Sequence, residues 1–167
     1  FSTPYITYFL IALNTVIFLY EVLGFGPHAR NQLMLQFGIV PARITGLMGG
    51  MRHVSAETAL LPILTSMFLH GGFLHLGGNM LYLWIFGNNV EDAMGHLRYL
   101  VFYLVCGLAA ALSQGLADPH AAIPMLGASG AISGVIASYV MIFPRARITV
   151  IIPLGILLYP IKISAFY

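Results

Sequence analysis

The sequence predicts an all-α membrane protein folded as a single bundle of helices. The composition, the spacing of the charged residues and the small residues inside apolar segments predict this class. Of the 167 residues, 59% are hydrophobic and 7% are charged, whereas soluble domains carry about 25% charged residues. So few charges cannot cover a soluble globule. The net charge of +2 is scattered rather than gathered into a basic stripe, so we expect a lipid bilayer and no nucleic acid as the partner.

Long charge-free runs predict the membrane spans. A span needs about 20 apolar residues, because each adds about 1.5 Å across a hydrocarbon core of about 30 Å. The predicted spans cover residues 5–23, 73–89, 98–117, 127–143 and 148–166. Lys162 is the one charge in the last of these and can reach the interface from a helix end.

A long first connection, residues 24–68, is neither polar nor a clean span. We expect a structured, partly embedded loop of short interfacial helices, since flexible loops rarely carry so much Leu, Met and Phe. Arg98, Arg145 and Arg147 follow the second and fourth spans, which places those turns and the N-terminus on the cytoplasmic side. Because both ends look trimmed, we expect one transmembrane domain over residues 1–167, truncated at both ends.

Polar groups inside hydrocarbon are costly, so each one is a candidate for function. His75 and Asn79 are four residues apart in the second span, which puts both side chains on one helix face. Gly77 and Gly78 keep the helix thin there. An isolated pair of this kind is ordinarily hydrogen-bonding glue between helices.

The segment Gly127-Ala128-Ser129-Gly130 begins the fourth span. A serine between small residues at a helix start has an exposed hydroxyl near free backbone N–H groups, which favour developing negative charge. A nucleophile and an oxyanion both need such a place. The common alternative is a serine that only caps the helix.

Small residues recur every fourth position along this span. One row is Gly130, Gly134 and Ser138, and the row beside it is Ser129, Ser133 and Ala137. Small residues at this spacing let another helix approach closely. We expect the first row to lie open in this chain and to receive a helix that is not part of it.

Together these features resemble the rhomboid family of intramembrane serine proteases. The resemblance rests on three segments that are similar to family motifs: His70 to Asn79 with its His-x-x-x-Asn pair, Val90 to Gly95 with Glu91 and Gly95, and Gly127 to Gly130. It implies a six-helix rhomboid-like bundle, of which five helices would be present here.

The resemblance also implies roles for individual residues. Ser129 would be the nucleophile that attacks a peptide bond of a transmembrane substrate, and His75 and Asn79 would bind the oxyanion. Gly127, Gly130 and His70 would support the site, and Glu91 would order the turn after the second span. No cofactor and no metal are implied. The expected location is a bacterial-type plasma membrane.

Two positions depart from the family pattern. Where the family often carries Trp-Arg, this chain has Leu61 and Pro62. The general-base histidine, which the family carries on a sixth helix, has no recognisable counterpart, so we expect it beyond residue 167. The alternative function is a non-catalytic pseudoprotease that binds membrane clients.

Two other functions fit less well. A transporter would need more intramembrane charge than the spans contain. A metal site at His70 and His75 would place its ligands five residues apart with no acidic partner in the span.

Overall fold

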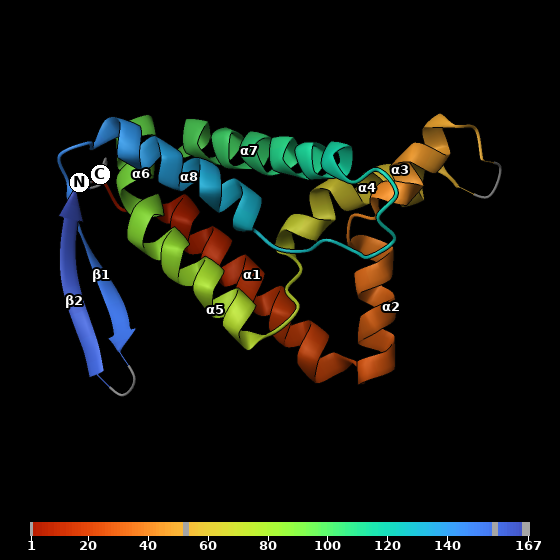
Figure 1. Ribbon diagram of the computed structural model, residues 1–167, viewed down its shortest axis with the longest axis horizontal. Helices are drawn as coiled ribbons and strands as arrows, with labels where there is room; N and C mark the ends of the chain where they lie inside the picture. The colour runs from red at the N-terminus through yellow and green to blue at the C-terminus, as the bar shows by residue number, and fades with distance from the viewer. Residues whose placement is uncertain (1, 52–53, 155–156, 165–167) are drawn as a thin grey trace.

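A computed structural model describes residues 2–51, 54–154 and 157–164 (Figure 1). The helices are α1 (Tyr5–Gly24), α2 (Pro27–Phe37), α3 (Pro41–Met48), α4 (Ala56–Thr65), α5 (Phe73–Tyr82), α6 (Asn88–Met94), α7 (His96–Ala117) and α8 (Ser129–Ile142). A 3-10 turn η1 (Ser66–Phe68) follows α4, and a π-helical turn η2 (Leu83–Gly87) joins α5 to α6. Strands β1 (Arg147–Leu154) and β2 (Leu157–Ser164) follow α8. The helical bundle that the sequence predicts is confirmed.

Helix α8 lies at the centre of the bundle. It packs against α7 on one side and against α5, η2 and α6 on the other, with α1 behind α5 (Figure 1). The start of α1 lies beside α6, where Ile6 contacts Glu91, and its later part lies beside the start of α5, where Phe18 contacts Phe73. Helix α1 is therefore antiparallel to α5, and Ser129 and His75 lie at the same end of the bundle.

Helices occupy the positions of the first four predicted spans. Helices α1 and α7 are each long and apolar enough to cross a bilayer. The pair formed by residues 56–68 and 73–94 is apolar enough together but bends by 72° between its two halves. Helix α8 has only 14 residues, which rise about 21 Å against a core of about 30 Å.

The first connection consists of α2, α3, α4 and η1. It is a structured loop of short helices, as predicted. These short helices lie to one side of the bundle (Figure 1). They hydrogen-bond to the loop that precedes α8: Ala42 N–H donates to Ala121 O at 3.1 Å, and Thr45 Oγ1 donates to Pro119 O at 3.0 Å. The first connection therefore holds the segment that leads to Ser129.

The predicted fifth helix over residues 148–166 is wrong for its described part. The two strands pair antiparallel from Arg147 opposite Ser164 to Leu154 opposite Leu157, while residues 155–156 and 165–166 lie outside the described residues. Five β-branched residues in a row, 148–152, favour an extended backbone. Pro153 and Pro160 would each interrupt a helix. Hydropathy alone does not separate these two structures.

The sequence predicts an open row of small residues at Gly130, Gly134 and Ser138. This prediction is wrong, because α7 covers the row. A Cβ atom on Gly130 would lie 2.5 Å from Ala110 Cβ, and one on Gly134 would lie 2.5 Å from Cys106 Sγ. Helix α7 offers its own small residues here, so the two backbones approach closely. The exposed row of α8 is the neighbouring one: Ser129, Ser133 and Ala137.

Candidate active site

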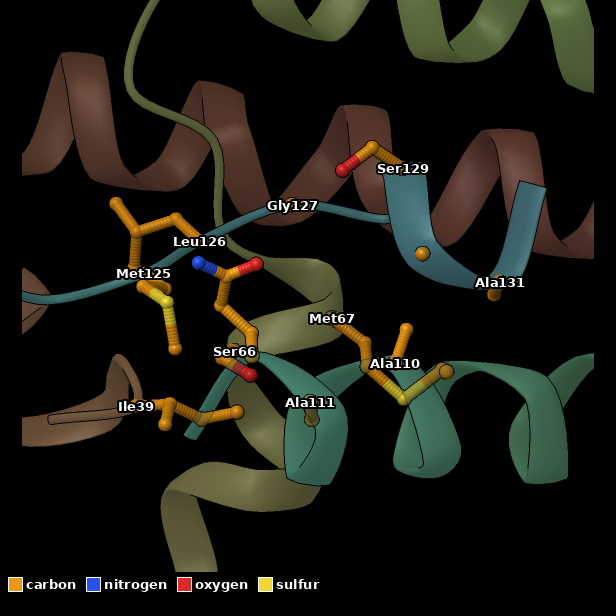
Figure 2. Close-up of a pocket in the computed structure, with 13 residues that line it drawn as sticks. Ile39, Ser66, Met67, Ala110, Ala111, Met125, Leu126, Gly127, Ser129 and Ala131 are labelled. Carbon is orange, nitrogen blue, oxygen red and sulfur yellow. The ribbon is translucent and has the colours of Figure 1, made fainter. Parts of the chain in front are cut away.

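Ser129 is the first residue of α8, and its side chain is exposed. The capping position is Ala128, and no side chain caps the helix. The alternative of a helix-capping serine is therefore wrong. Within the described part of the chain, Ser129 Oγ has no hydrogen-bond partner, and the hydroxyl points back toward Gly127 (Figure 2). Its own N–H is one of the free donors of the first helical turn.

Gly127 sets the backbone that leads to Ser129. Its φ of +111° is in a region that other residues rarely adopt. Its N–H donates to Ser66 O at 2.8 Å. A Cβ here would lie 2.6 Å from His75 Nε2 and 3.4 Å from Asn79 Nδ2. Only glycine permits this approach, which brings the polar face of α5 against the backbone two residues before Ser129.

His75 and Asn79 offer two donors beside that backbone. His75 is exposed, and its Nδ1 accepts a hydrogen bond from Gly71 N–H at 3.4 Å. In a neutral imidazole this leaves the proton on Nε2. Asn79 is 7% exposed, and its Nδ2 has no partner in the structure. The structure thus brings together the two residues that sequence spacing had paired, with both donors unused.

His70 lies directly behind His75. Its side chain is fully buried, and the two rings meet edge to face with centroids 5.1 Å apart. Burial, and then the charge of His75, lower the pKa of His70 to about 4. Its ring is therefore neutral at pH 7 and backs the His75 ring without adding charge.

A cavity of about 250 Å³ opens beside Ser129 (Figure 2). Ser129 and Gly127 lie along one side, Met67 and Ala110 along another, and Ile39 with Met125 at the far end. Ser66 and Gln114 add polar groups to an otherwise apolar lining. A cavity of this size holds several water molecules, each of which occupies about 30 Å³ in the liquid.

Backbone hydrogen bonds brace the loop before Ser129. Leu61 and Pro62 stand where the family that the sequence resembles often carries Trp-Arg. Ile39 and Met125 exchange backbone hydrogen bonds of 3.1 and 2.8 Å. Gly38 permits this pairing, since a Cβ there would lie 2.6 Å from Leu126 Cδ2. Sequence analysis missed these residues, and Gly38 between two helical segments was the available signal.

Arg30 is a second residue that sequence analysis missed. Its Nη2 donates to the backbone oxygen of His70 at 3.2 Å, across forty residues of sequence. The signal was a cation just after the helix-ending Gly26-Pro27 pair, in an otherwise apolar region.

Among the described residues, no three His, Cys, Asp or Glu side chains gather where they could hold a metal ion. The polar side chains that gather near Gly127 are the hydroxyl of Ser129, the imidazole of His75 and the amide of Asn79.

Comparison with known proteins identifies the family. Residues 57–166 match the Rhomboid domain. The chain is 32% identical to Rhomboid protease GluP of Bacillus subtilis over 131 residues, which are 78% of this chain and 23% of that protein. It is 37% identical to Rhomboid protein 1, mitochondrial, of Saccharomyces cerevisiae over 95 residues, 54% of this chain and 28% of that protein.

A relative without activity by its name matches as well. Inactive rhomboid protein 1 of Drosophila melanogaster is 34% identical over 89 residues, 52% of this chain and 6% of that protein. The chain spans less than a third of each of these three relatives. No solved structure matches it significantly. With a domain match over more than half of its length, the chain is an integral membrane protein of the rhomboid family.

Proposed function

We propose that this protein is an intramembrane serine endopeptidase that cleaves transmembrane protein substrates. One observation carries the proposal: His75 Nε2 and Asn79 Nδ2 converge on the backbone of Gly127, two residues before an unhindered Ser129. Two unused donors beside a free hydroxyl are the arrangement that acyl transfer needs. The relative named as a protease matches 78% of the chain.

In the proposed reaction, Ser129 Oγ loses its proton to the general base and attacks the carbonyl carbon of the scissile peptide bond. The C=O electron pair moves to the oxygen, which becomes an oxyanion. His75 Nε2–H, Asn79 Nδ2–H and the Ser129 N–H then donate to that oxygen. Collapse of the resulting intermediate breaks the C–N bond, the amine leaves with that proton, and water then hydrolyses the acyl-enzyme by the same route. Gly127 and Gly130 keep the start of α8 close to its neighbours, and His70 backs the His75 ring.

The depth of the site supports a substrate within the membrane. Helix α8 rises about 21 Å, so with its far end at one face its first residue lies about 9 Å below the other. A single domain over residues 1–167 and a bacterial-type plasma membrane with a cytoplasmic N-terminus belong to this proposal. The relatives come from mitochondria as well as bacteria.

The general base is the part of the mechanism that needs a further residue. Among the described histidines, none hydrogen-bonds to Ser129 Oγ. We place the base on a segment beyond residue 167. Because α7 covers the Gly130 row, that segment would pack on the exposed row of Ser129, Ser133 and Ala137.

The second candidate is a pseudoprotease that binds membrane clients. It is favoured by the relative named as inactive, and it would use the same cavity without cleavage.

The experiment is cleavage of a transmembrane reporter, with labelling by a fluorophosphonate probe, on the full-length protein in liposomes. Ser129→Ala should abolish both, because the attacking oxygen is gone. Ser113→Ala, which removes an exposed hydroxyl from α7 away from the cavity lining, should retain both. Cleavage that persists in Ser129→Ala excludes the assignment, and absence of cleavage and labelling in the wild type supports the pseudoprotease.

A further inference from the structure

Arg30 belongs to the first turn of α2, yet its side chain hydrogen-bonds to the turn that precedes α5. Its Nη2 donates to His70 O at 3.2 Å. Its guanidinium also lies over the Phe18 ring, 5.3 Å from the centroid. Phe18 is fully buried and meets Phe73 edge to face at 5.0 Å. A planar guanidinium can hydrogen-bond to a carbonyl and lie over an aromatic face at the same time. These two contacts fix the side-chain conformation of Arg30.

The carbonyl that Arg30 binds belongs to the same peptide unit as the Gly71 N–H. That N–H donates to His75 Nδ1 at 3.4 Å. A cation that hydrogen-bonds to an amide oxygen polarises the amide and strengthens its N–H as a donor. One peptide therefore links the Arg30 charge to the His75 ring.

The link decides which ring nitrogen of His75 carries the proton. A neutral imidazole has one donor and one acceptor nitrogen. With Nδ1 accepting from Gly71, the donor is Nε2, which is the nitrogen that faces Gly127. The other tautomer would present a lone pair to the oxyanion and repel it.

Glu21 is the acidic side chain next to this arrangement. It lies in α1, is 3% exposed, and neither carboxylate oxygen has a hydrogen-bond partner in the structure. Arg30 is the charged side chain close enough to act on it.

We propose that Arg30 is a positioning residue that holds His75 as the Nε2–H tautomer through the His70–Gly71 peptide. The role of the Nε2–H donor in catalysis rests on the proposed function. The tautomer of His75 can be measured whether or not the protein cleaves a substrate.

The test measures the tautomer directly. Full-length protein with ¹⁵N-labelled histidine is studied by NMR in a Ser129→Ala background, where His75→Asn identifies the His75 signals. The wild-type arrangement should give an unprotonated Nδ1. Arg30→Met should raise the Nδ1–H form severalfold. Arg43→Met is the matched control, because Arg43 of the same loop also donates to a backbone carbonyl, that of Leu35, and should leave the signals unchanged.

Kinetics provides the second readout. With Ser129 intact, Arg30→Met should lower kcat about tenfold, which is less than the about 10²–10³-fold loss for removing an oxyanion donor, and leave KM within about twofold. Because an unfolded fraction also lowers the apparent kcat without changing KM, kcat is expressed per active site titrated with the fluorophosphonate probe.

The outcomes separate the two proposals. An unchanged His75 tautomer in folded Arg30→Met overturns the inference, whatever the activity. If Arg30→Met does not fold, Arg30→Gln keeps a donor without the charge, and an unchanged tautomer there overturns it equally. A shifted tautomer in a protein that never cleaves the reporter upholds the inference and rejects the endopeptidase.

Discussion

Two buried acidic residues lie near opposite ends of α1 and differ in their hydrogen bonding. Glu21 belongs to the end of α1, and Glu91 of α6 contacts its start. Glu91 accepts hydrogen bonds from Ile6 N–H at 2.9 Å, from Thr7 N–H at 2.8 Å and from Thr7 Oγ1 at 2.7 Å, and it pairs with His96. Among the residues that the structure describes, Glu21 has no hydrogen-bond partner for either oxygen. Both side chains are almost fully buried.

The difference separates a structural end of the bundle from a functional one. At the Glu91 end the carboxylate joins α1 to α6 and α7, and its bonding is complete. At the other end, Asn79 Nδ2 and both His70 ring nitrogens are also buried without hydrogen-bond partners. Native structures rarely leave buried polar groups unpaired. The Tyr99 hydroxyl, near Thr7 at the Glu91 end, is also without a partner among the described residues, so the functional end is distinguished by the unpaired groups of His70 and Asn79 that surround His75 and Gly127. Substitutions should therefore affect stability at one end and activity at the other.

The largest effect is expected for Glu91→Ala. Three donors on α1 and the His96 ring would lose their acceptor in a buried place, which costs about 3–5 kcal/mol of unfolding free energy. Reversible unfolding in detergent micelles measures this. The control is Asp92→Ala, because Asp92 is the neighbouring residue but is exposed and should change the unfolding free energy far less. Equal losses in the two variants would contradict the structural role.

Asn79→Ala should show the reverse pattern. Its Nδ2 has no partner to leave unpaired, so the unfolding free energy should change by about 1 kcal/mol or less. Loss of one oxyanion donor should lower kcat about 10²–10³-fold with KM nearly unchanged. A variant that loses stability but keeps kcat would make Asn79 a structural residue.

Acid should destabilise the His70 end. The pKa of His70 is lowered by burial to about 4, against 6.5 for the unperturbed side chain. Below pH 6.5 the His70 of the unfolded chain binds a proton that the folded chain does not. As the pH is lowered from 6.5 to about 4, the unfolding free energy therefore decreases, and above pH 6.5 it does not change. The total is at most about 3 kcal/mol. His70→Gln should remove this slope from a pH series of unfolding curves, and an unchanged slope would contradict the assignment.

The sequence predicted what depends on local spacing. His75 and Asn79 share a face because they are four residues apart, and Ser129 starts a helix because glycine ends the preceding loop. Both follow from backbone periodicity, which a sequence carries directly.

Tertiary contacts explain what the sequence could not predict. The Gly130 row was expected to be open, but α7 covers it, since a small-residue row does not specify its partner. The Arg30 bond to His70 spans forty residues and leaves no periodic signal. Residues 147–154 and 157–164 form strands although their hydropathy also suits a membrane span, so only β-branching and proline indicate the strands.

The smallest effect is expected from the coupling between Glu21 and Arg30. This coupling tests whether Glu21 acts through Arg30, whereas Glu91 stabilises the fold. Glu21 and Arg30 interact by charge without a direct hydrogen bond, so their coupling should be roughly 0.5–1 kcal/mol. A double-mutant cycle with Glu21→Gln, Arg30→Met and both together measures it from kcat. If Glu21 acts only by offsetting the Arg30 charge, Glu21→Gln should lower kcat alone but change nothing further in the Arg30→Met background. Additive losses would mean that Glu21 acts independently of Arg30, and an unfolding loss as large as that of Glu91→Ala would make Glu21 a second structural acid.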